Sequence, residues 1–405
     1  GKPYYPRNYG YAYHGPVSIR ESLGSSLNIP AVKVLQSVGL YSFVGLLSRF
    51  GITFPEEPDH YGLALVLGGG ETSLADVTRA YASLALSAKS VTPIDVLEVR
   101  DRNGVVREQA AQPFHEALFP LSSSAEQAAV LVSDILMDKS ARLLSFGSSN
   151  LLDVGKRVAI KTGTTKDFRD NWAFGYTPEI VVGVWVGNAD NSAMQGVSGI
   201  TGAVPIWHDV MLAYLKNVKD IQWPNVDGLV RRRICLPSGK LADETCAKTR
   251  EETFIKGTEP TEKDDWYVEA TVDAKTGLLT TDACLMATVK KIFLHPPPEY
   301  DAWLTAKGVE RLPTCDCEGR LRGGVTPLTI LSPLEDDQFE RETHLAPEAF
   351  QIPFIAGGER RSAYHWRLNG MPLTSDGPTL LWSPQPGSYT LELEGADRRV
   401  QFFVR

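Results

Sequence analysis

The run Lys161-Thr162-Gly163-Thr164-Thr165 has the residue types needed to bind an extended ligand that ends in a carboxylate. The lysine supplies positive charge, the threonine hydroxyls donate hydrogen bonds, and Gly163 leaves the backbone open to close approach. The run ends a β-branched segment, residues 157–162, that predicts a strand, so a peptide could add to its edge as a further strand. A phosphate loop is a poor alternative, because the order of G-x-x-x-x-G-K-[ST] is reversed here. Lys-Thr-Gly alone is a weak signal, since it occurs again at Lys275-Thr276-Gly277.

A second set of polar groups lies in the segment Ser25-Ser26-Leu27-Asn28, about 130 residues before the lysine. The hydroxyl of Ser26 and the amide of Asn28, two residues apart on a loop, can face one pocket together. Helix capping is the alternative interpretation, because Ser and Asn are favoured caps and Pro30 suits a first helical turn. Taken alone the segment favours capping, and its interest comes from its pairing with the Lys161 strand.

The first 220 residues alternate between helical and strand patterns, which must position these groups. Apolar periodicity with start and stop residues predicts helices, and β-branched runs predict strands. A hairpin over residues 94–106 should turn at Asn103-Gly104. Three consecutive antiparallel strands flanked by helices make an α+β domain. The predicted helices cover residues 29–38, 40–50, 77–86, 128–137 and 204–215, and the predicted strands cover residues 157–162, 171–176 and 180–186.

Residues 223–320 differ in character, since they hold all five cysteines and many prolines. They indicate a loop-rich, crosslinked connector without a long helix. Cys315-Asp316-Cys317 is too tight for a zinc knuckle and no H-x-x-x-H pair occurs, so disulfides are favoured over a metal and no metal site is predicted. Cys235 and Cys246 lie in one short segment and are expected to pair. Cys284 could pair with Cys315 or Cys317, and the two are not ranked.

The pattern of residues 321–405 predicts a small all-β sandwich. Trp366 and Leu368 alternate with polar residues, as do the odd-numbered residues from Tyr389 to Leu393. Turn signals at Asn369-Gly370 and Pro386-Gly387 separate these short runs. No nucleophile and base occur together in this region, so a recognition role is expected.

Composition limits the class of protein. The chain has 405 residues and a formal net charge of −8, which argues against a general nucleic-acid binder. No apolar run approaches the ~20 residues of a membrane helix. The amino terminus has no signal-peptide pattern and no initiator Met, so any anchor is expected outside this sequence. No cofactor motif is found. Trp172, Trp185 and Trp207 are expected in the core.

The two polar segments follow the order found in the serine transpeptidase and β-lactamase superfamily, where S-x-x-K, S-x-N and K-T-G surround one cleft. More specifically, the chain resembles the transpeptidase half of class A penicillin-binding proteins, closest to the 1C type. The segments that carry this resemblance extend beyond the motifs to both ends of the chain. They are Tyr5–Tyr9, His14–Ser18, Gly69–Leu74, Asp170–Pro178, Cys235–Gly239 and His365–Gly370.

The resemblance implies a role for each matching residue. Ser26 would relay protons, and Asn28 would contact the substrate amide and the general-base lysine. Lys161 would give electrostatic support, Thr162 and Thr164 would bind the terminal carboxylate of a stem peptide, and Gly163 and Thr165 would support them. The implied reaction is D,D-transpeptidation of peptidoglycan stem peptides through an acyl-enzyme, with β-lactams as inhibitors. For the terminal sandwich two partners stay open, glycan strands and other envelope proteins. The implied location is the periplasmic face of the bacterial inner membrane.

One departure from the family pattern is serious, because no S-x-x-K occurs in the 405 residues. The nearest imitation, Thr245-Cys246-Ala247-Lys248, begins with Thr and lies in the connector. Acyl transfer needs an activated nucleophile beside a base, so the chain is expected to be inert alone, with the nucleophile and a glycosyltransferase domain upstream. Two alternatives stay open: a catalytically inactive module that binds peptide or a partner, and, less favoured, a class A β-lactamase-like hydrolase. The predicted domains are residues 1–222, 223–320 and 321–405.

Overall fold

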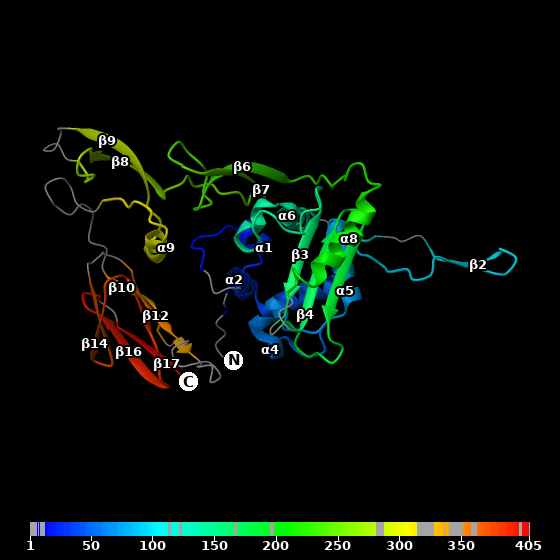
Figure 1. The fold of residues 1–405 in the computed structure, drawn as a ribbon, viewed down its shortest axis with the longest axis horizontal. Coiled ribbons are helices and arrows are strands. Elements are labelled where there is room, and N and C mark those ends of the chain that lie inside the picture. Colours follow the sequence, from blue (N-terminus) through cyan, green and yellow to red (C-terminus); the bar gives the residue numbers. More distant parts are fainter. Residues whose placement is uncertain are drawn as a thin grey trace.

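A computed structural model gives the structure of the protein (Figure 1). It describes residues 6, 8, 13–111, 115–120, 124–165, 168–194, 198–280, 287–313, 328–335, 337–339, 351–357, 363–396 and 399–404. The described part is mixed α+β, with several small antiparallel sheets and a β-rich carboxy-terminal region. Cys284, Cys315 and Cys317 lie outside the described residues, so their predicted pairing stays a prediction.

A three-stranded antiparallel sheet is the centre of the first half of the chain. Its strands are β3 (Ala159–Thr164), β4 (Asp170–Tyr176) and β5 (Val181–Gly187), in the order β3-β4-β5. Helix α8 (Ala203–Leu215) packs on one face, and α5 (Leu74–Ala85) and α6 (Ala125–Met137) pack on the other. The three predicted strands and the helices that cover them are therefore present, with bounds within three residues of those predicted.

Two glycines in the sheet allow this close packing. A Cβ added to Gly175 in β4 would overlap the indole of Trp207 in α8, which is fully buried. A Cβ added to Gly183 in β5 would overlap Thr78 in α5. Each glycine therefore marks the point where a helix lies directly on the sheet backbone.

The amino-terminal helices lie beside β3 in Figure 1. Helix α1 (Ile19–Gly24) has a capping box between Ser18 and Glu21. Helix α2 ends at Gly39, whose φ of 86° is costly for other residues. The helices that follow are α2 (Asn28–Val38), α3 (Leu40–Arg49), α4 (Pro58–Tyr61), a 3-10 helix (Gly62–Leu67), a further 3-10 turn (Ser140–Arg142) and α7 (Leu143–Phe146).

The predicted hairpin turning at Asn103-Gly104 is present, formed by β1 (Glu98–Arg100) and β2 (Val106–Gln109). Gly104 has a φ of 79°, and Asp101 caps the turn through the amides of residues 103 and 105. Figure 1 shows the hairpin projecting away from the sheet.

The connector is less loop-rich than predicted, because it contains two hairpins. They are β6 (Leu229–Cys235) with β7 (Thr249–Ile255) and β8 (Tyr267–Asp273) with β9 (Thr288–Leu294). The prediction missed them because both are exposed two-stranded ribbons rich in charged residues, such as Arg231-Arg232-Arg233, which lack an alternating apolar face. A 3-10 turn (Pro298–Tyr300) and the short helix α9 (Asp301–Ala306) follow. The predicted Cys235–Cys246 disulfide is confirmed, with the Cα atoms 5.7 Å apart.

Two sheets enclose one hydrophobic core in the carboxy-terminal region. One sheet has the order β10-β12-β15 and the other β11-β17-β16-β13-β14. Trp366, Phe354 and Phe402 are fully buried between them. The strands are β10 (Thr329–Ser332), β11 (Asp337–Phe339), β12 (Ile352–Gly357), β13 (Tyr364–Leu368), β14 (Met371–Ser375), β15 (Thr379–Trp382), β16 (Gly387–Leu393) and β17 (Val400–Val404).

Among the described residues, no single helix is long and apolar enough to cross a membrane. Helices α2 and α3 pass that test only as a pair, and they meet at a bend of 95°.

Candidate active site

The structure brings Ser26 and Lys161 into direct contact. Ser26 lies in the tight connection between α1 and α2, and Lys161 is the third residue of β3. The Lys161 Nζ donates to Ser26 Oγ at 2.6 Å, across 135 residues of sequence, and also to the Thr162 carbonyl oxygen at 2.7 Å. The two polar segments that were paired from sequence therefore meet beside the middle of β3.

The backbone before Ser26 is held by the elements around it. Helix α1 ends at Ser25, whose buried hydroxyl donates to the Ala141 carbonyl at 2.7 Å. A Cβ added to Gly24 would overlap Ala141, so the end of α1 packs directly on the 3-10 turn that contains Ala141. Ser26 then takes a φ of 56°, an uncommon conformation for a residue with a side chain. Such conformations persist only where the surroundings fix them, and they are concentrated at functional sites.

Helix capping, the alternative interpretation of this segment, does not explain it. The N-cap of α2 is Leu27, whose apolar side chain makes no capping hydrogen bond. Asn28 is the first residue of α2 and is half-buried. The amide of the next residue, Ile29, donates to Asn8 Oδ1 at 3.2 Å, so the start of α2 is tied to the amino-terminal segment.

Lys161 has an unusual protonation equilibrium. Burial lowers its pKa from 10.5 to about 8, because removing the ammonium group from water disfavours the charged form. An amine whose pKa lies near neutrality can exchange protons with a hydrogen-bonded hydroxyl at working pH. The Ser26–Lys161 pair can therefore hold and move a proton.

The edge of β3 is open to a ligand strand in the part of the chain that the structure describes, where β3 pairs only with β4. Because successive side chains of a strand point to opposite faces, Thr162 lies on the face that α8 covers, beside the buried Ala173, while Lys161 points to the Ser26 face. Gly163 lies opposite Trp172 in the β3–β4 register. A peptide added along the free edge would pass both sets of side chains.

The last two threonines of the run bond to neighbouring loops. Thr164 is exposed, and its Oγ1 accepts a hydrogen bond from the Gly199 amide at 3.0 Å. Thr165 Oγ1 donates to Asp170 Oδ2 and accepts from the Asp170 amide, both at 2.9 Å. Thr165 therefore closes the turn between β3 and β4, which is a structural role.

Asp170 contributes to the site, although the sequence did not predict it as a site residue. Its other carboxylate oxygen, Oδ1, accepts from the indole Nε1 of Trp185 at 2.9 Å, so Asp170 ties Thr165 to a tryptophan on β5. The available signal was a hydroxyl and a carboxylate on the two sides of a predicted turn between strands, an arrangement that often closes a hairpin.

The expectation that all three tryptophans are core residues is wrong for Trp185. Trp207 is fully buried, but Trp185 is 37% exposed and Trp172 is half-buried. Trp172 stacks on Phe174 with ring centroids 5.7 Å apart, and its centroid lies 6.3 Å from that of Trp185. The outer end of this aromatic row is exposed because β5 is an edge strand among the described strands, which its apolar sequence does not reveal.

Comparisons with known proteins find penicillin-binding proteins among the similar sequences and structures. The family model "Penicillin-binding protein 1A, C-terminal domain" matches residues 226–269, and "Penicillin-Binding Protein C-terminus Family" matches residues 317–402. The crystal structure of penicillin-binding protein 1A from Haemophilus influenzae superimposes with a TM-score of 0.55 over 65% of this chain and 43% of that chain. Its sequence identity is 24%, so this likeness speaks for the fold alone.

The curated relatives are longer than this chain. Penicillin-binding protein 1A of Aquifex aeolicus is 32% identical over 64% of the chain, and the match spans 34% of that relative. The chain is therefore similar to the class A penicillin-binding proteins, and the two matching family models cover residues 226–269 and 317–402. Along 96% of its length it is similar to penicillin-binding protein 1C of Escherichia coli K12, at 29% identity, and it spans 49% of that relative.

Proposed function

We propose that this chain is the transpeptidase-related and carboxy-terminal part of a bifunctional peptidoglycan synthase, which cross-links stem peptides by serine acyl transfer. The observation that carries the proposal is the contact between Ser26 and Lys161 beside the open edge of β3, in a chain similar to penicillin-binding protein 1C. The activity belongs to the whole protein, of which these 405 residues are about half the length of that relative.

In this proposal a stem peptide lies along the free edge of β3. The hydroxyls of Thr162 and Thr164 would bind its terminal carboxylate on one face of the strand, and Lys161 would give electrostatic support from the other. A serine attacks the carbonyl of the terminal D-alanyl-D-alanine bond while a lysine base takes its proton. The tetrahedral intermediate then expels D-alanine, which takes a proton through Ser26. The amine of a second stem peptide attacks the acyl-enzyme, forms the cross-link and returns the serine. Asn28 would orient the peptide amide, and Gly163 would let the peptide backbone approach.

The attacking serine and its base come from outside these 405 residues in the proposal, because the chain has no S-x-x-K. A β-lactam would bind in the same place, since its carboxylate and strained amide resemble the end of the stem peptide. The setting is the periplasmic face of the inner membrane, and the terminal pair of sheets would contact other envelope proteins. The proposed domains are residues 1–222, 223–320 and 321–405, and residue 320 lies outside the described residues.

The second candidate is an inactive transpeptidase-like module that binds peptide without chemistry. The missing S-x-x-K favours it, while the hydrogen-bonded Ser26–Lys161 pair favours an enzyme, because a lysine whose pKa is lowered toward neutrality is concentrated at functional sites. A β-lactamase-like hydrolase is the weakest candidate, since the connector and terminal sheets have no place in a compact hydrolase.

Labelling with a fluorescent penicillin, read by denaturing electrophoresis, tests the proposal. The 405-residue chain alone should not form a covalent adduct. Supplying a segment that carries S-x-x-K, fused or as a second chain, should produce labelling, and Lys161→Ala should weaken that labelling at least about tenfold. Lys275→Ala is the matched control, because Lys275 belongs to the second Lys-Thr-Gly, in the turn between β8 and β9, and should label normally.

Two results would change the conclusion. A stoichiometric adduct on the chain alone would show that a nucleophile lies within it. Absence of labelling in the supplemented protein, together with retained binding of a peptide ending in D-alanyl-D-alanine, would favour the inactive module.

A further inference from the structure

The guanidinium of Arg20 joins three segments of the chain. Arg20 lies in α1 and is 7% exposed. Its Nε donates to Glu252 Oε2 on β7 at 2.8 Å, and its Nη2 donates to the other oxygen of the same carboxylate. It also forms ion pairs with Asp134 in α6, at 2.7 Å, and with Asp138, the residue directly after α6, at 3.3 Å. The connector hairpin is thus tied by a bidentate ion pair to the short helix that precedes Ser26.

Helix α1 has only six residues, so it moves as one unit between its two attachments. At its start, Arg20 binds Glu252 and the α6 carboxylates. At its end, Gly24 and Ser25 pack on and bond to Ala141. Ser26 follows directly in its left-handed conformation. A change at the first attachment is therefore transmitted to the Ser26 hydroxyl and its contact with Lys161.

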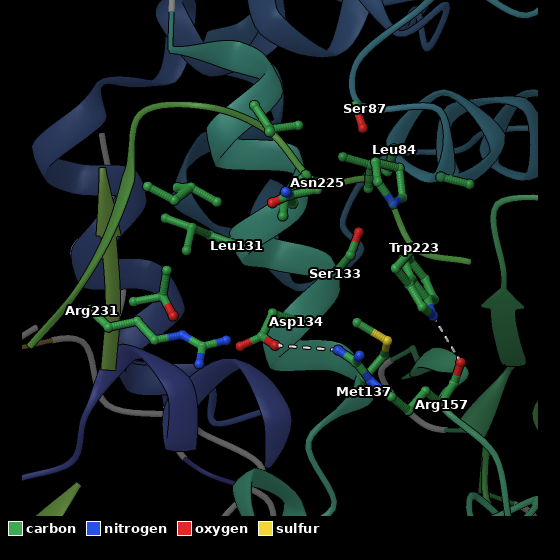
Figure 2. Close-up of a pocket in the computed structure, with 16 residues that line it drawn as sticks. Leu84, Ser87, Leu131, Ser133, Asp134, Met137, Arg157, Trp223, Asn225 and Arg231 are labelled. Carbon is green, nitrogen blue, oxygen red and sulfur yellow. Dashed lines mark hydrogen bonds and ion pairs between the residues drawn. The ribbon is translucent and has the colours of Figure 1, made fainter. Parts of the chain in front are cut away.

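The remaining interface between the connector and α6 is not a continuous apolar seam. A cleft of about 370 Å³ opens beside the Arg20 cluster, between α6 and the segment that enters β6. Figure 2 shows Asp134 at its base between Arg157 and Arg231, with Trp223 and Asn225 along its wall. The Asp134–Arg157 ion pair across it is long, at 3.9 Å, and Arg157 is exposed. The hairpin contacts α1 through the buried Arg20–Glu252 pair, at hydrogen-bond distance, and through a longer Arg250–Glu21 pair at 3.8 Å.

We infer that Glu252, on the connector hairpin, is a positioning residue for Ser26 and acts through Arg20. The role of Ser26 in catalysis rests on the proposed function, but the link from Glu252 to the Ser26–Lys161 contact does not. The connector is then part of the framework of the site, although β7 begins 85 residues beyond the end of β3 in the sequence. The electrostatics agree, because burial alone would raise the pKa of Glu252, yet the hydrogen bonds and charge of Arg20 outweigh it and hold that pKa below its usual value.

The test uses Glu252→Gln in the full chain. The variant keeps the size of the side chain and leaves Arg20 paired with Asp134 and Asp138, so the fold should persist. Glu251→Gln is the matched control, because Glu251 is the neighbouring residue of β7 and is exposed. Arg20→Lys is a second variant, because a lysine keeps the charge but cannot bind a carboxylate through two parallel hydrogen bonds.

The main measurement is competitive acetylation of Lys161 across pH, read by mass spectrometry, which needs no catalytic activity. In the unchanged chain Lys161 should titrate near its lowered pKa of about 8. In Glu252→Gln the Ser26 loop should move away and admit water, which raises that pKa by at least about one unit. The reactive fraction at about pH 8 then falls about fivefold. Hydrogen exchange of residues 19–29 should become faster in the same variant, and Glu251→Gln should change neither quantity.

An unchanged Lys161 titration and unchanged exchange of residues 19–29 in both Glu252→Gln and Arg20→Lys would overturn the inference, whatever happens to the melting temperature. A rise in the Lys161 pKa in those variants, without any penicillin labelling of the supplemented protein, would support the inference while contradicting the proposed reaction.

Discussion

Replacing Lys161 with methionine should change the stability of the protein in a way that depends on pH. Methionine has a similar length but no charge, so the variant removes an ammonium group that is held in a half-buried site. The folded-state pKa of Lys161 is about 8, below its value of 10.5 in the unfolded chain. Between these two pH values the unfolded chain binds more protons than the folded one, so the free energy of unfolding rises with pH across that window.

The size of the effect follows from the difference between the two pKa values. At about pH 7 burial of the charged lysine costs about 3 kcal/mol, and by about pH 9.5 the cost falls to about 1 kcal/mol. The variant also loses the hydrogen bonds to Ser26 and Thr162, worth about 1 kcal/mol each, and this loss varies little with pH. Lys161→Met should therefore be more stable than the unchanged protein by about 1 kcal/mol at about pH 7 and slightly less stable at about pH 9.5.

Urea denaturation of both proteins between about pH 7 and about pH 9.5, followed by tryptophan fluorescence, measures the difference. Tyr81 and Tyr176 also have pKa values raised by burial, but they are common to both proteins and cancel in the comparison. A difference in stability that stays constant across this range would refute the argument that Lys161 is held in a desolvated site. Hydrogen exchange of β3 amides provides an independent check of the same difference.

Two further outcomes are expected. Gly175→Ala should destabilise the sheet by at least about 2 kcal/mol, because the new Cβ would overlap the buried Trp207. The control Gly377→Ala has no atom near its added Cβ and should change stability by less than about 0.5 kcal/mol. Equal melting temperatures of the two variants would contradict the packing of α8 on β4. Replacing Cys235 and Cys246 with serine should destabilise the β6–β7 region by about 3 kcal/mol, because the disulfide closes a loop with a sequence separation of 11 residues. If non-reducing peptide mapping of the unchanged chain recovers both thiols free, the crosslink is contradicted.

The central elements were predictable because their patterns are local. The strands of the sheet carry apolar residues on both faces, since helices cover each face, and they form short runs rich in β-branched or aromatic residues in the sequence. The amphipathic helices have clear starts and stops, such as Gly39 after α2. The β6–β7 and β8–β9 hairpins gave no such signal, because these two-stranded ribbons carry many charged residues and bury only a few apolar side chains.

The candidate site also has features that could be predicted from the sequence and features that could not. The residue types of Ser26 and Lys161 and the order of their motifs predicted that the two would lie close together, and their 2.6 Å contact lies beside the middle of β3. The functions of the threonines were less predictable, because strand alternation separates Thr162 from Lys161 and the hydroxyl of Thr165 is used by Asp170. A motif gives the residue types, but the register and the turn decide which hydroxyls are available to a ligand.

The Arg20 cluster marks the limit of sequence reasoning for this chain. Arg20 and Glu252 are 232 residues apart, and each lies in a segment whose local pattern requires only a polar residue. A buried guanidinium among three carboxylates is costly to desolvate unless every partner is present, so loss of one partner has a larger effect than an exposed ion pair would. This dependence is what allows a residue of the connector to fix a loop of the site. It also gives a physical reason why the connector accompanies the transpeptidase-like sheet, because without the hairpin Arg20 would lose the carboxylate that it binds through two hydrogen bonds.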